Sequence, residues 1–179
     1  MSQPPLLPAC LAIFIASAFP AKAADAPAAP MGPLGGPLVF TLDNGDYVAL
    51  DNAEGEPIRG ISQPRGIPGA PSWEDDGLEV ITWRSDIARV QMPPEGATAT
   101  VTNRFGHCLT LYAVEDIRWA TCRGGDTTQV WQVHDGSLQS SPPWQGYLAY
   151  EKGFLDGRLH IVRGEHTMSL VPGVLTPAD

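Results

Sequence analysis

Short apolar runs, rich in β-branched and aromatic residues, alternate with turn residues over most of the chain. The run 38–42 is followed by Asp43-Asn44-Gly45-Asp46, and Asn-Gly between two apolar runs is the strongest short signal for a β-hairpin. No window of about 11 residues without Gly or Pro sustains the 3.6-residue period of a helix. The pattern predicts an all-β protein, with a loop at 58–72 and strands at 38–42, 47–50, 78–83, 97–102, 108–113, 117–122, 129–133, 146–150, 158–162 and 167–171.

Two segments of the chain resemble one another at a spacing of about forty residues. Residues 106–111 match 145–150, and the same offset carries 129–132 onto 168–171. A related first copy at 45–50 lies about sixty residues before the second and requires an insertion of about twenty residues. Three units of about forty residues, the first stretched by an insertion, predict a β-trefoil, a barrel capped by hairpins with pseudo-threefold symmetry.

Residues 1–23 have the features of a cleaved signal peptide. Residues 9–19 form an uncharged apolar run, and Ala21-Lys22-Ala23 supplies a small-x-small cleavage site. The run is too short to span a bilayer as a helix, which takes about 20 residues, although a short membrane anchor is the alternative. We expect an exported protein, secreted or periplasmic, without a transmembrane segment. Residues 24–37, rich in Pro, Ala and Gly, predict a flexible leader, and the domain is expected at 38–179.

Cysteine usage agrees with export. Loss of residues 1–23 leaves two cysteines, Cys108 and Cys122, which in an exported chain most simply form one disulfide. A thiol or metal pair is the alternative. The sequence contains no Cys-x-x-Cys and no His-Glu-x-x-His, so no metal site is expected.

The charge balance and the missing catalytic motifs narrow the function. The chain has 11 Lys and Arg and 20 Asp and Glu, a net charge of −9. This balance disfavours binding to nucleic acid, because such binding relies on Lys and Arg to neutralise the phosphates. No Gly-x-Ser-x-Gly elbow is present, and the carboxylates of Asp75 and Asp76 precede Gly77, where Asp is ordinary turn chemistry. We expect a protein that is not an enzyme and uses no cofactor.

Five tryptophans are the candidate contact residues. Trp73 and Trp144 fall in predicted loops, where an exposed indole suits contacts with a protein or a glycan, or else caps an end of the barrel. Trp83 and Trp119 fall on predicted strands and are further candidates, with packing in the core as the alternative. Trp131 is expected in the core.

One stretch resembles a repeat of the ricin-type β-trefoil, the R-type lectin-like family. It consists of Cys108-Leu109-Thr110-Leu111, Cys122 and Gln129-Val130-Trp131. The resemblance implies that the two cysteines are disulfide-linked, that Trp131 packs into the barrel core and that the Gln129 amide ties down its loop. Sugar-binding repeats of this family carry an Asp just after the first Cys and an aromatic residue before the second. Those positions fall here on Thr110 and near Ala120, beside Trp119, and the third repeat has Ala149 at the Asp position.

A closer resemblance is to the A- and C-type binding subunits of cytolethal distending toxins. These are exported ricin-like proteins of similar length, with a Pro-rich leader and degenerate sugar sites. The matching elements are Trp83, Pro94-Glu95-Gly96, Val101-Thr102-Asn103, Gly106-His107-Cys108 and Cys122. The resemblance implies a virulence role as a host-cell-binding or delivery subunit. Its partners would be a nuclease-type catalytic subunit, a companion binding subunit and a host-cell surface glycan or receptor.

Two other functions fit parts of the sequence. The first is a stand-alone secreted carbohydrate-binding lectin. The second is a periplasmic protease inhibitor on a small eight-stranded β-barrel, a family that this chain resembles in its Pro/Ala-rich leader, its single disulfide and a Trp soon after the second Cys. An up-and-down barrel of that kind predicts no threefold repeat.

Overall fold

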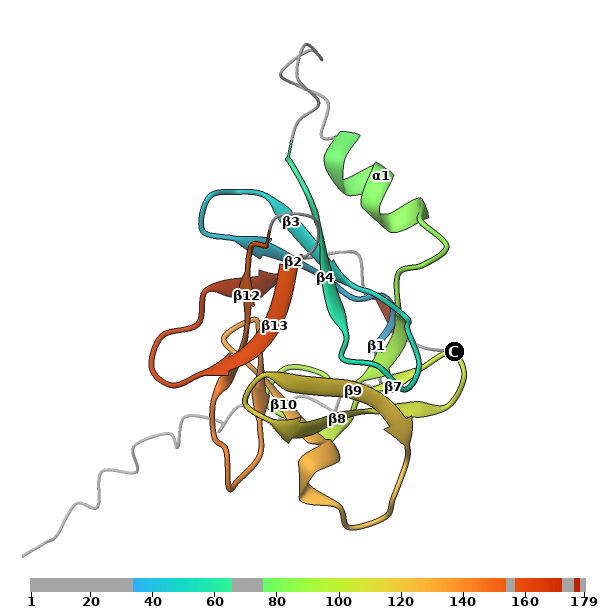
Figure 1. Cartoon of the computed structure of the whole chain (residues 1–179), viewed down its shortest axis with the longest axis vertical. Helices are drawn as coiled ribbons and strands as arrows, with labels where there is room; N and C mark the ends of the chain where they lie inside the picture. Colours follow the sequence, from blue (N-terminus) through green and yellow to red (C-terminus); the bar gives the residue numbers. More distant parts are fainter. Residues whose placement is uncertain (1–33, 66–75, 154–156, 172–175, 178–179) are drawn as a thin grey trace, which may run out of the picture.

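The computed structural model describes residues 34–65, 76–153, 157–171 and 176–177, and confirms the all-β class. Figure 1 shows short strands wrapped around a common centre, with α1 (Asp76–Trp83) at one end beside β3 and β4. In these described ranges, no helix has the length and apolar character to cross a membrane. The strands are β1 (Leu34–Pro37), β2 (Val39–Leu42), β3 (Tyr47–Leu50), β4 (Arg59–Gln63), β5 (Arg89–Met92), β6 (Thr98–Thr100), β7 (Thr102–Asn103), β8 (His107–Ala113), β9 (Asp116–Thr121), β10 (Val130–His134), β11 (Ser137–Ser140), β12 (Tyr147–Glu151), β13 (Gly157–Val162), β14 (Met168–Leu170) and β15 (Thr176–Pro177).

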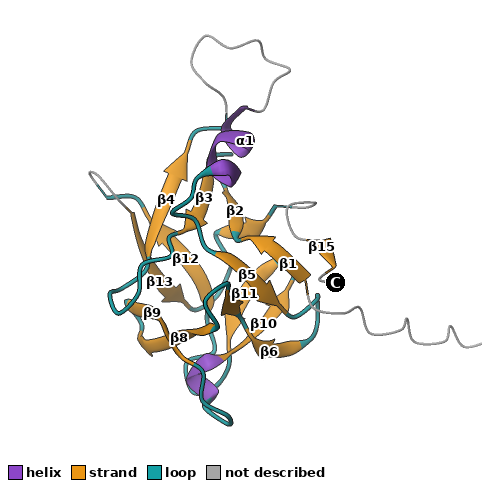
Figure 2. Cartoon of the chain, turned by 90° about the vertical axis from the view of Figure 1, so that its right-hand side faces the viewer, coloured by secondary structure: helices purple, strands orange, loops and turns teal. Residues whose placement is uncertain are grey.

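The strands form two antiparallel sheets that together curl around the core (Figure 2). Their orders are β15-β1-β5-β7-β8-β9 and β14-β2-β3-β4-β13-β12-β11-β10-β6. Single residues, Leu38 and Val101, separate β1 from β2 and β6 from β7, so each of these pairs is one bent segment that takes part in both sheets.

Six segments pair in a closed ring: β1/β2, β5, β6/β7, β10, β11 and β14. The β1–β5, β5–β7, β6–β10, β10–β11 and β14–β2 pairs supply five of the contacts. Between β11 and β14, the Leu170 N–H donates to the Gly136 carbonyl at 2.6 Å, and the buried Ser137 hydroxyl donates to the Met168 carbonyl. The chain therefore closes on itself, and β14 lies between β2 and β11.

One apolar core fills the ring. Phe40 from β2, Trp131 from β10 and Leu138 from β11 are fully buried in the same cluster, together with Val90 from β5 and Met168 from β14. A second, smaller cluster lies under α1, where Ile81 packs with buried residues of β2 and β3. The inward positions alternate with outward ones along β5, β10 and β13, as expected for strands with one face on a core.

Two tight turns, the predicted one at Asn44-Gly45 and one between β10 and β11, have the backbone geometry that their residues favour. The Asn44-Gly45 turn joins β2 to β3, with Gly45 at a φ of 86°, and the Asn44 side chain accepts the Asp46 N–H at 3.0 Å. The β10–β11 turn holds Asp135 and Gly136 at φ values of 51° and 69°. Asp and Gly tolerate positive φ, which such tight hairpins require.

The strand predicted at 78–83 is wrong, because this segment is the helix α1. Leu78 and Ile81 are one helical turn apart and pack together against the second apolar cluster, so burial selects a helical rather than an alternating pattern. The Thr82 hydroxyl donates to the Glu79 carbonyl at 2.9 Å within the helix. Tertiary packing here overrides the preference of β-branched residues for strands.

Two further expectations need correction. The predicted loop at 58–72 contains β4, which pairs with both β3 and β13, and 66–72 lies outside the described residues. The last four residues of the predicted leader, Leu34–Pro37, form β1 and pair with β5, because ladder hydrogen bonds come from the backbone and two glycines can supply them. The rest of the leader and the predicted signal peptide at 1–23 lie outside the described residues.

Gly60 and Gly157 lie opposite one another on β4 and β13, and the Tyr150 ring packs against both. A Cβ added at Gly157 would lie 1.7 Å from Tyr150 Cε2, and one added at Gly60 would lie 2.5 Å from Tyr150 Cδ2. The missing side chains therefore create the space that the tyrosine fills.

We predict that Gly157→Ala lowers the free energy of unfolding by about 1–3 kcal/mol, because the added methyl overpacks the Tyr150 contact. Urea denaturation of the two proteins measures the change. Gly124→Ala is the matched control, since a Cβ at Gly124 meets nothing within 4 Å. Gly157→Ala should lower the free energy of unfolding less in a Tyr150→Ala background than in the wild type, because the ring that the methyl overpacks is then missing. Equal denaturation midpoints for wild type and Gly157→Ala would contradict this packing.

Candidate functional site

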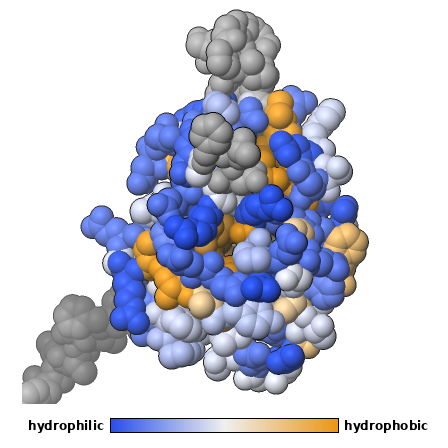
Figure 3. Space-filling model, viewed as in Figure 1, coloured by the Kyte–Doolittle hydropathy of each residue, from blue (hydrophilic) through white to orange (hydrophobic). Residues whose placement is uncertain are grey.

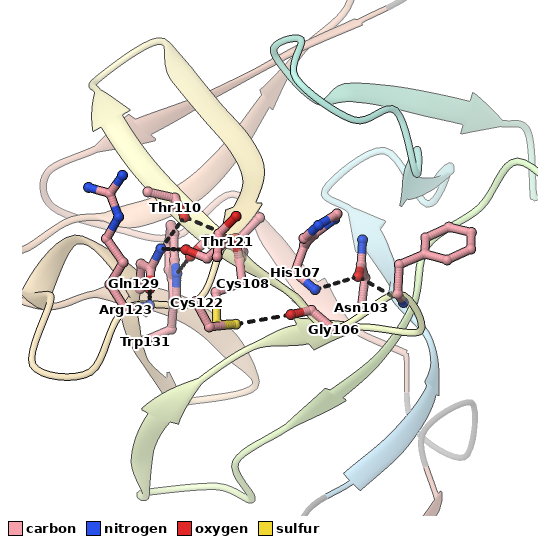
Figure 4. Close-up of a disulfide and its surroundings, with 12 residues drawn as sticks. Asn103, Gly106, His107, Cys108, Thr110, Thr121, Cys122, Arg123, Gln129 and Trp131 are labelled. Carbon is pink, nitrogen blue, oxygen red and sulfur yellow. Dashed lines mark hydrogen bonds between the residues drawn. A yellow bond between two sulfur atoms is a disulfide. The ribbon is translucent and has the colours of Figure 1, made fainter.

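The predicted disulfide between Cys108 and Cys122 is confirmed, with an S–S distance of 2.03 Å. Cys108 lies on β8 and Cys122 directly follows β9, so the bond staples the β8–β9 hairpin at its open end (Figure 4). The Cys108 side is buried, and the bond closes a loop with a sequence separation of 14 residues.

Gln129 and Trp131 fasten the segment after β9 to the hairpin. The buried Gln129 amide donates to the Thr110 hydroxyl at 3.0 Å and to the Thr121 carbonyl at 2.9 Å, and its oxygen accepts the Arg123 N–H at 2.7 Å (Figure 4). The fully buried Trp131 indole donates to the Leu109 carbonyl at 2.8 Å. Every polar group of these two side chains therefore has an internal partner.

The positions that hold a sugar-binding carboxylate in ricin-like repeats are internal in this chain. Thr110 is 3% exposed, and its hydroxyl donates to the Cys108 carbonyl at 2.9 Å while accepting from Gln129. Ala149 is 1% exposed. Trp119 is also buried, and its indole donates to the Asp51 carbonyl at 2.9 Å. All three side chains are therefore too buried to contact a sugar from solvent.

The remaining predicted tryptophans have different environments. Trp83, at the end of α1, is 78% exposed. Trp144 is half-buried and packs against the main core cluster, so it is only partly available for contact. Trp73 lies outside the described residues. Trp83, Trp119 and Trp144, the predicted contact tryptophans that the structure describes, therefore do not form one common surface.

A cleft of about 640 Å³ opens between the segment after β3, the outer side of β4, the end of α1 and the β7–β8 turn. Arg84 and Asp86 form a two-point ion pair on one wall, at 3.0 Å and 2.7 Å. In the same cleft, Arg59 Nε lies 3.9 Å from Asp51 Oδ2. Phe105, 54% exposed, completes the lining, and the Arg104 guanidinium lies 4.8 Å from its ring centroid.

The two carboxylates of this cleft differ electrostatically. The side-chain hydrogen bond from Arg84 lowers the pKa of Asp86. Burial raises the pKa of Asp51, although the Arg59 N–H donates to its carboxylate at 3.2 Å and opposes that shift. The cleft therefore offers cationic donors, anionic acceptors and an exposed apolar ring.

A second cleft, of about 650 Å³, is lined by Glu54 and Gly55, which directly follow the residues 51–53 that line the first. His107 Nδ1 faces Glu54 Oε1 at 3.2 Å. Arg118 pairs with Asp116 at 2.6 Å and 2.9 Å and also donates to the Gly55 carbonyl at 3.0 Å. Its guanidinium lies 5.6 Å from the ring centroid of Tyr112, which is 55% exposed.

The two clefts repeat one chemical arrangement, an exposed aromatic ring beside arginine–carboxylate pairs. Such a surface can hydrogen-bond a polar partner while the ring packs against it, and aromatic and Arg side chains dominate binding hot spots. Figure 3 shows a face covered mainly by hydrophilic residues, on which apolar residues occur in separate small groups. Phe105 and Tyr112 were not predicted as contact residues from the sequence. What distinguishes them there is an aromatic side chain at a turn or near the end of a strand.

No family model matches the sequence, and a search of curated proteins finds no match.

We predict that Gln129→Leu lowers the free energy of unfolding by about 1–3 kcal/mol, because the buried Thr110 hydroxyl and Thr121 carbonyl lose their donor. Gln132→Leu is the matched control. It lies nearby on β10, and its amide makes one long contact, 3.4 Å, with the Gly96 carbonyl. Urea denaturation separates the two variants, and a Gln132→Leu loss equal to that of Gln129→Leu would show that Gln129 has no special fastening role.

Proposed function

We propose that the chain is a secreted, non-catalytic binding module with a ricin-type β-trefoil fold. The closed ring of six segments supports this proposal, since a trefoil barrel has six strands. The three pairs β3–β4, β8–β9 and β12–β13, one in each unit, correspond to its capping hairpins.

The spacing of corresponding strands also supports three units. From the second unit to the third, β8 and β12, β9 and β13, and β10 and β14 begin about forty residues apart, the length of one unit. From the first unit to the second, β3 and β8, like β4 and β9, begin about sixty residues apart, whereas β5 and β10 begin about forty apart. The extra residues of the first unit therefore lie between β4 and β5, in the segment that contains α1.

The pairing pattern disfavours the protease-inhibitor alternative. In an up-and-down barrel each strand pairs with its neighbours in the chain. Here β2 pairs with β14, β4 with β13 and β6 with β10. These long-range pairs fit a barrel built from three units.

The single observation that carries the binding role is the pair of clefts flanking 51–55, each with an exposed ring. Phe105 lines the first cleft together with the ion-paired Arg84, and Tyr112 lies beside the ion-paired Arg118 in the second. The exposed Trp83 directly precedes Arg84. These are the residue types that anchor protein interfaces. We assign to the chain the role of a host-cell-binding or delivery subunit in a cytolethal-distending-type toxin assembly, with a nuclease-type catalytic subunit and a companion binding subunit as partners.

Contact through a protein receptor fits this surface better than a galactose-type sugar pocket does. The side chains at the expected sugar positions, Thr110 and Ala149, are buried, and Thr110 is committed to internal hydrogen bonds. A stand-alone lectin would need a different pocket.

We predict that the double variant Trp83→Ala/Phe105→Ala binds cultured epithelial cells at least about tenfold more weakly than wild type, because truncating two aromatic anchors costs more than about 1.4 kcal/mol. Binding of the fluorescently labelled protein is measured by flow cytometry. Val114→Ala is the control, an apolar truncation at the β8–β9 tip that lines neither cleft.

Three outcomes distinguish the candidates. Saturable binding that the double variant weakens supports the proposal. Binding that disappears after enzymatic removal of cell-surface glycans, with the double variant unaffected, favours the lectin. No saturable binding, together with no co-purification with a nuclease encoded by a neighbouring reading frame, would contradict the delivery role.

A further inference from the structure

We propose that Glu95, His134 and Asp135 form a binding site for Zn²⁺ at one end of the barrel, independent of the two clefts. Glu95 comes from the turn before β6, His134 is the last residue of β10, and Asp135 opens the β10–β11 turn. Their ligand atoms all lie within 4.8 Å of one another, and all three residues are exposed. Glu95 and His134 are distant in the sequence and meet only in the fold, which explains why no short metal-binding motif is visible there.

The backbone holds the three residues in place. The Gly96 N–H donates to the Val133 carbonyl at 2.8 Å, which ties the Glu95 turn to the end of β10. The Glu95 carboxylate accepts the Asp135 and Gly136 N–H groups at 2.8 Å and 3.2 Å. Each carboxylate oxygen accepts one of these bonds, and both keep a further lone pair for a cation.

The imidazole is oriented as well. The His134 ring stacks on Tyr147 with centroids 6.4 Å apart and an interplanar angle of 16°, and His166 lies on Tyr147 at 5.6 Å. This places His134 Nε2 3.5 Å from Asp135 Oδ2. Donor atoms in a tetrahedral zinc site are about 3.4 Å apart, given bonds of about 2.05 Å. The His134–Asp135 pair is already at about that separation, and the exposed Glu95 side chain, within 4.8 Å of both, completes the site by a small movement.

The donor set determines the class of cation. One imidazole nitrogen with two carboxylates suits Zn²⁺, whereas Ca²⁺ and Mg²⁺ prefer sites made of oxygen alone. Three protein ligands leave a fourth position for water.

Isothermal titration of the full mature chain with ZnCl₂ at pH 7.5 tests the site. We expect one Zn²⁺ per chain, a loss of affinity of tenfold or more in His134→Ala, and a clear weakening in Glu95→Gln. Glu95→Gln keeps one oxygen to accept a turn N–H, so it separates ligation from the structural role of the side chain. Glu79→Gln, which removes one negative charge from exposed α1, is the control for diffuse attraction to an acidic protein and should bind like wild type.

The proposal is overturned if no saturable binding occurs up to 1 mM Zn²⁺, or if His134→Ala binds as tightly as wild type. Equal losses in Glu79→Gln and Glu95→Gln would also overturn it, because they would indicate charge alone. Far-UV circular dichroism of His134→Ala verifies folding, and Asp135→Asn provides a second ligand variant. Failure of zinc binding leaves cell binding through the clefts untouched, because the two sites share no residue.

Discussion

The closed ring of strands around one shared core is the constraint on which the rest of this structure depends. Trp131 shows it most clearly: the indole is fully buried among side chains from every part of the ring, and its N–H is satisfied by the Leu109 carbonyl of a neighbouring strand. A few neighbouring short strands cannot bury such a core alone, since they leave one apolar face in water. The stability of the core therefore depends on closure of the ring. The buried Ser137 hydroxyl contributes to that closure by donating to the Met168 carbonyl.

The buried side chains are committed to packing and internal hydrogen bonds, so the groups available to a partner lie in the loops outside the core. Thr110, the position that the ricin-type resemblance assigns to a sugar-binding carboxylate, is buried, and its hydroxyl helps to hold Gln129. The segment that follows α1 supplies Arg84 and Asp86 to the first cleft, directly after the exposed Trp83. Exposed rings and ion pairs are thus gathered in the two clefts that residues 51–55 help to line.

Much of the fold follows from local signals. The strand 47–50, the Asn44-Gly45 hairpin and the cystine were predictable because alternation, turn chemistry and cysteine count act over short distances. The helix α1 was not, because its identity comes from Leu78 and Ile81 packing on a distant cluster. β4 was hidden by Gly60, whose missing side chain makes room for Tyr150 from β12. The clefts were equally invisible, since Arg59, Arg84 and Phe105 meet only after the ring has closed.

Cross-linking of β2 to β14 tests ring closure most directly. Thr41 and Ser169 are paired across these two strands, although they lie near opposite ends of the domain in sequence. The double variant Thr41→Cys/Ser169→Cys should form an intramolecular disulfide in most molecules under mild oxidation, identified by mass spectrometry of the linked peptides, while Thr41→Cys alone keeps a free thiol. If the two new thiols remain free, or bond only between molecules, the first and last units are not neighbours and the threefold arrangement proposed here is wrong.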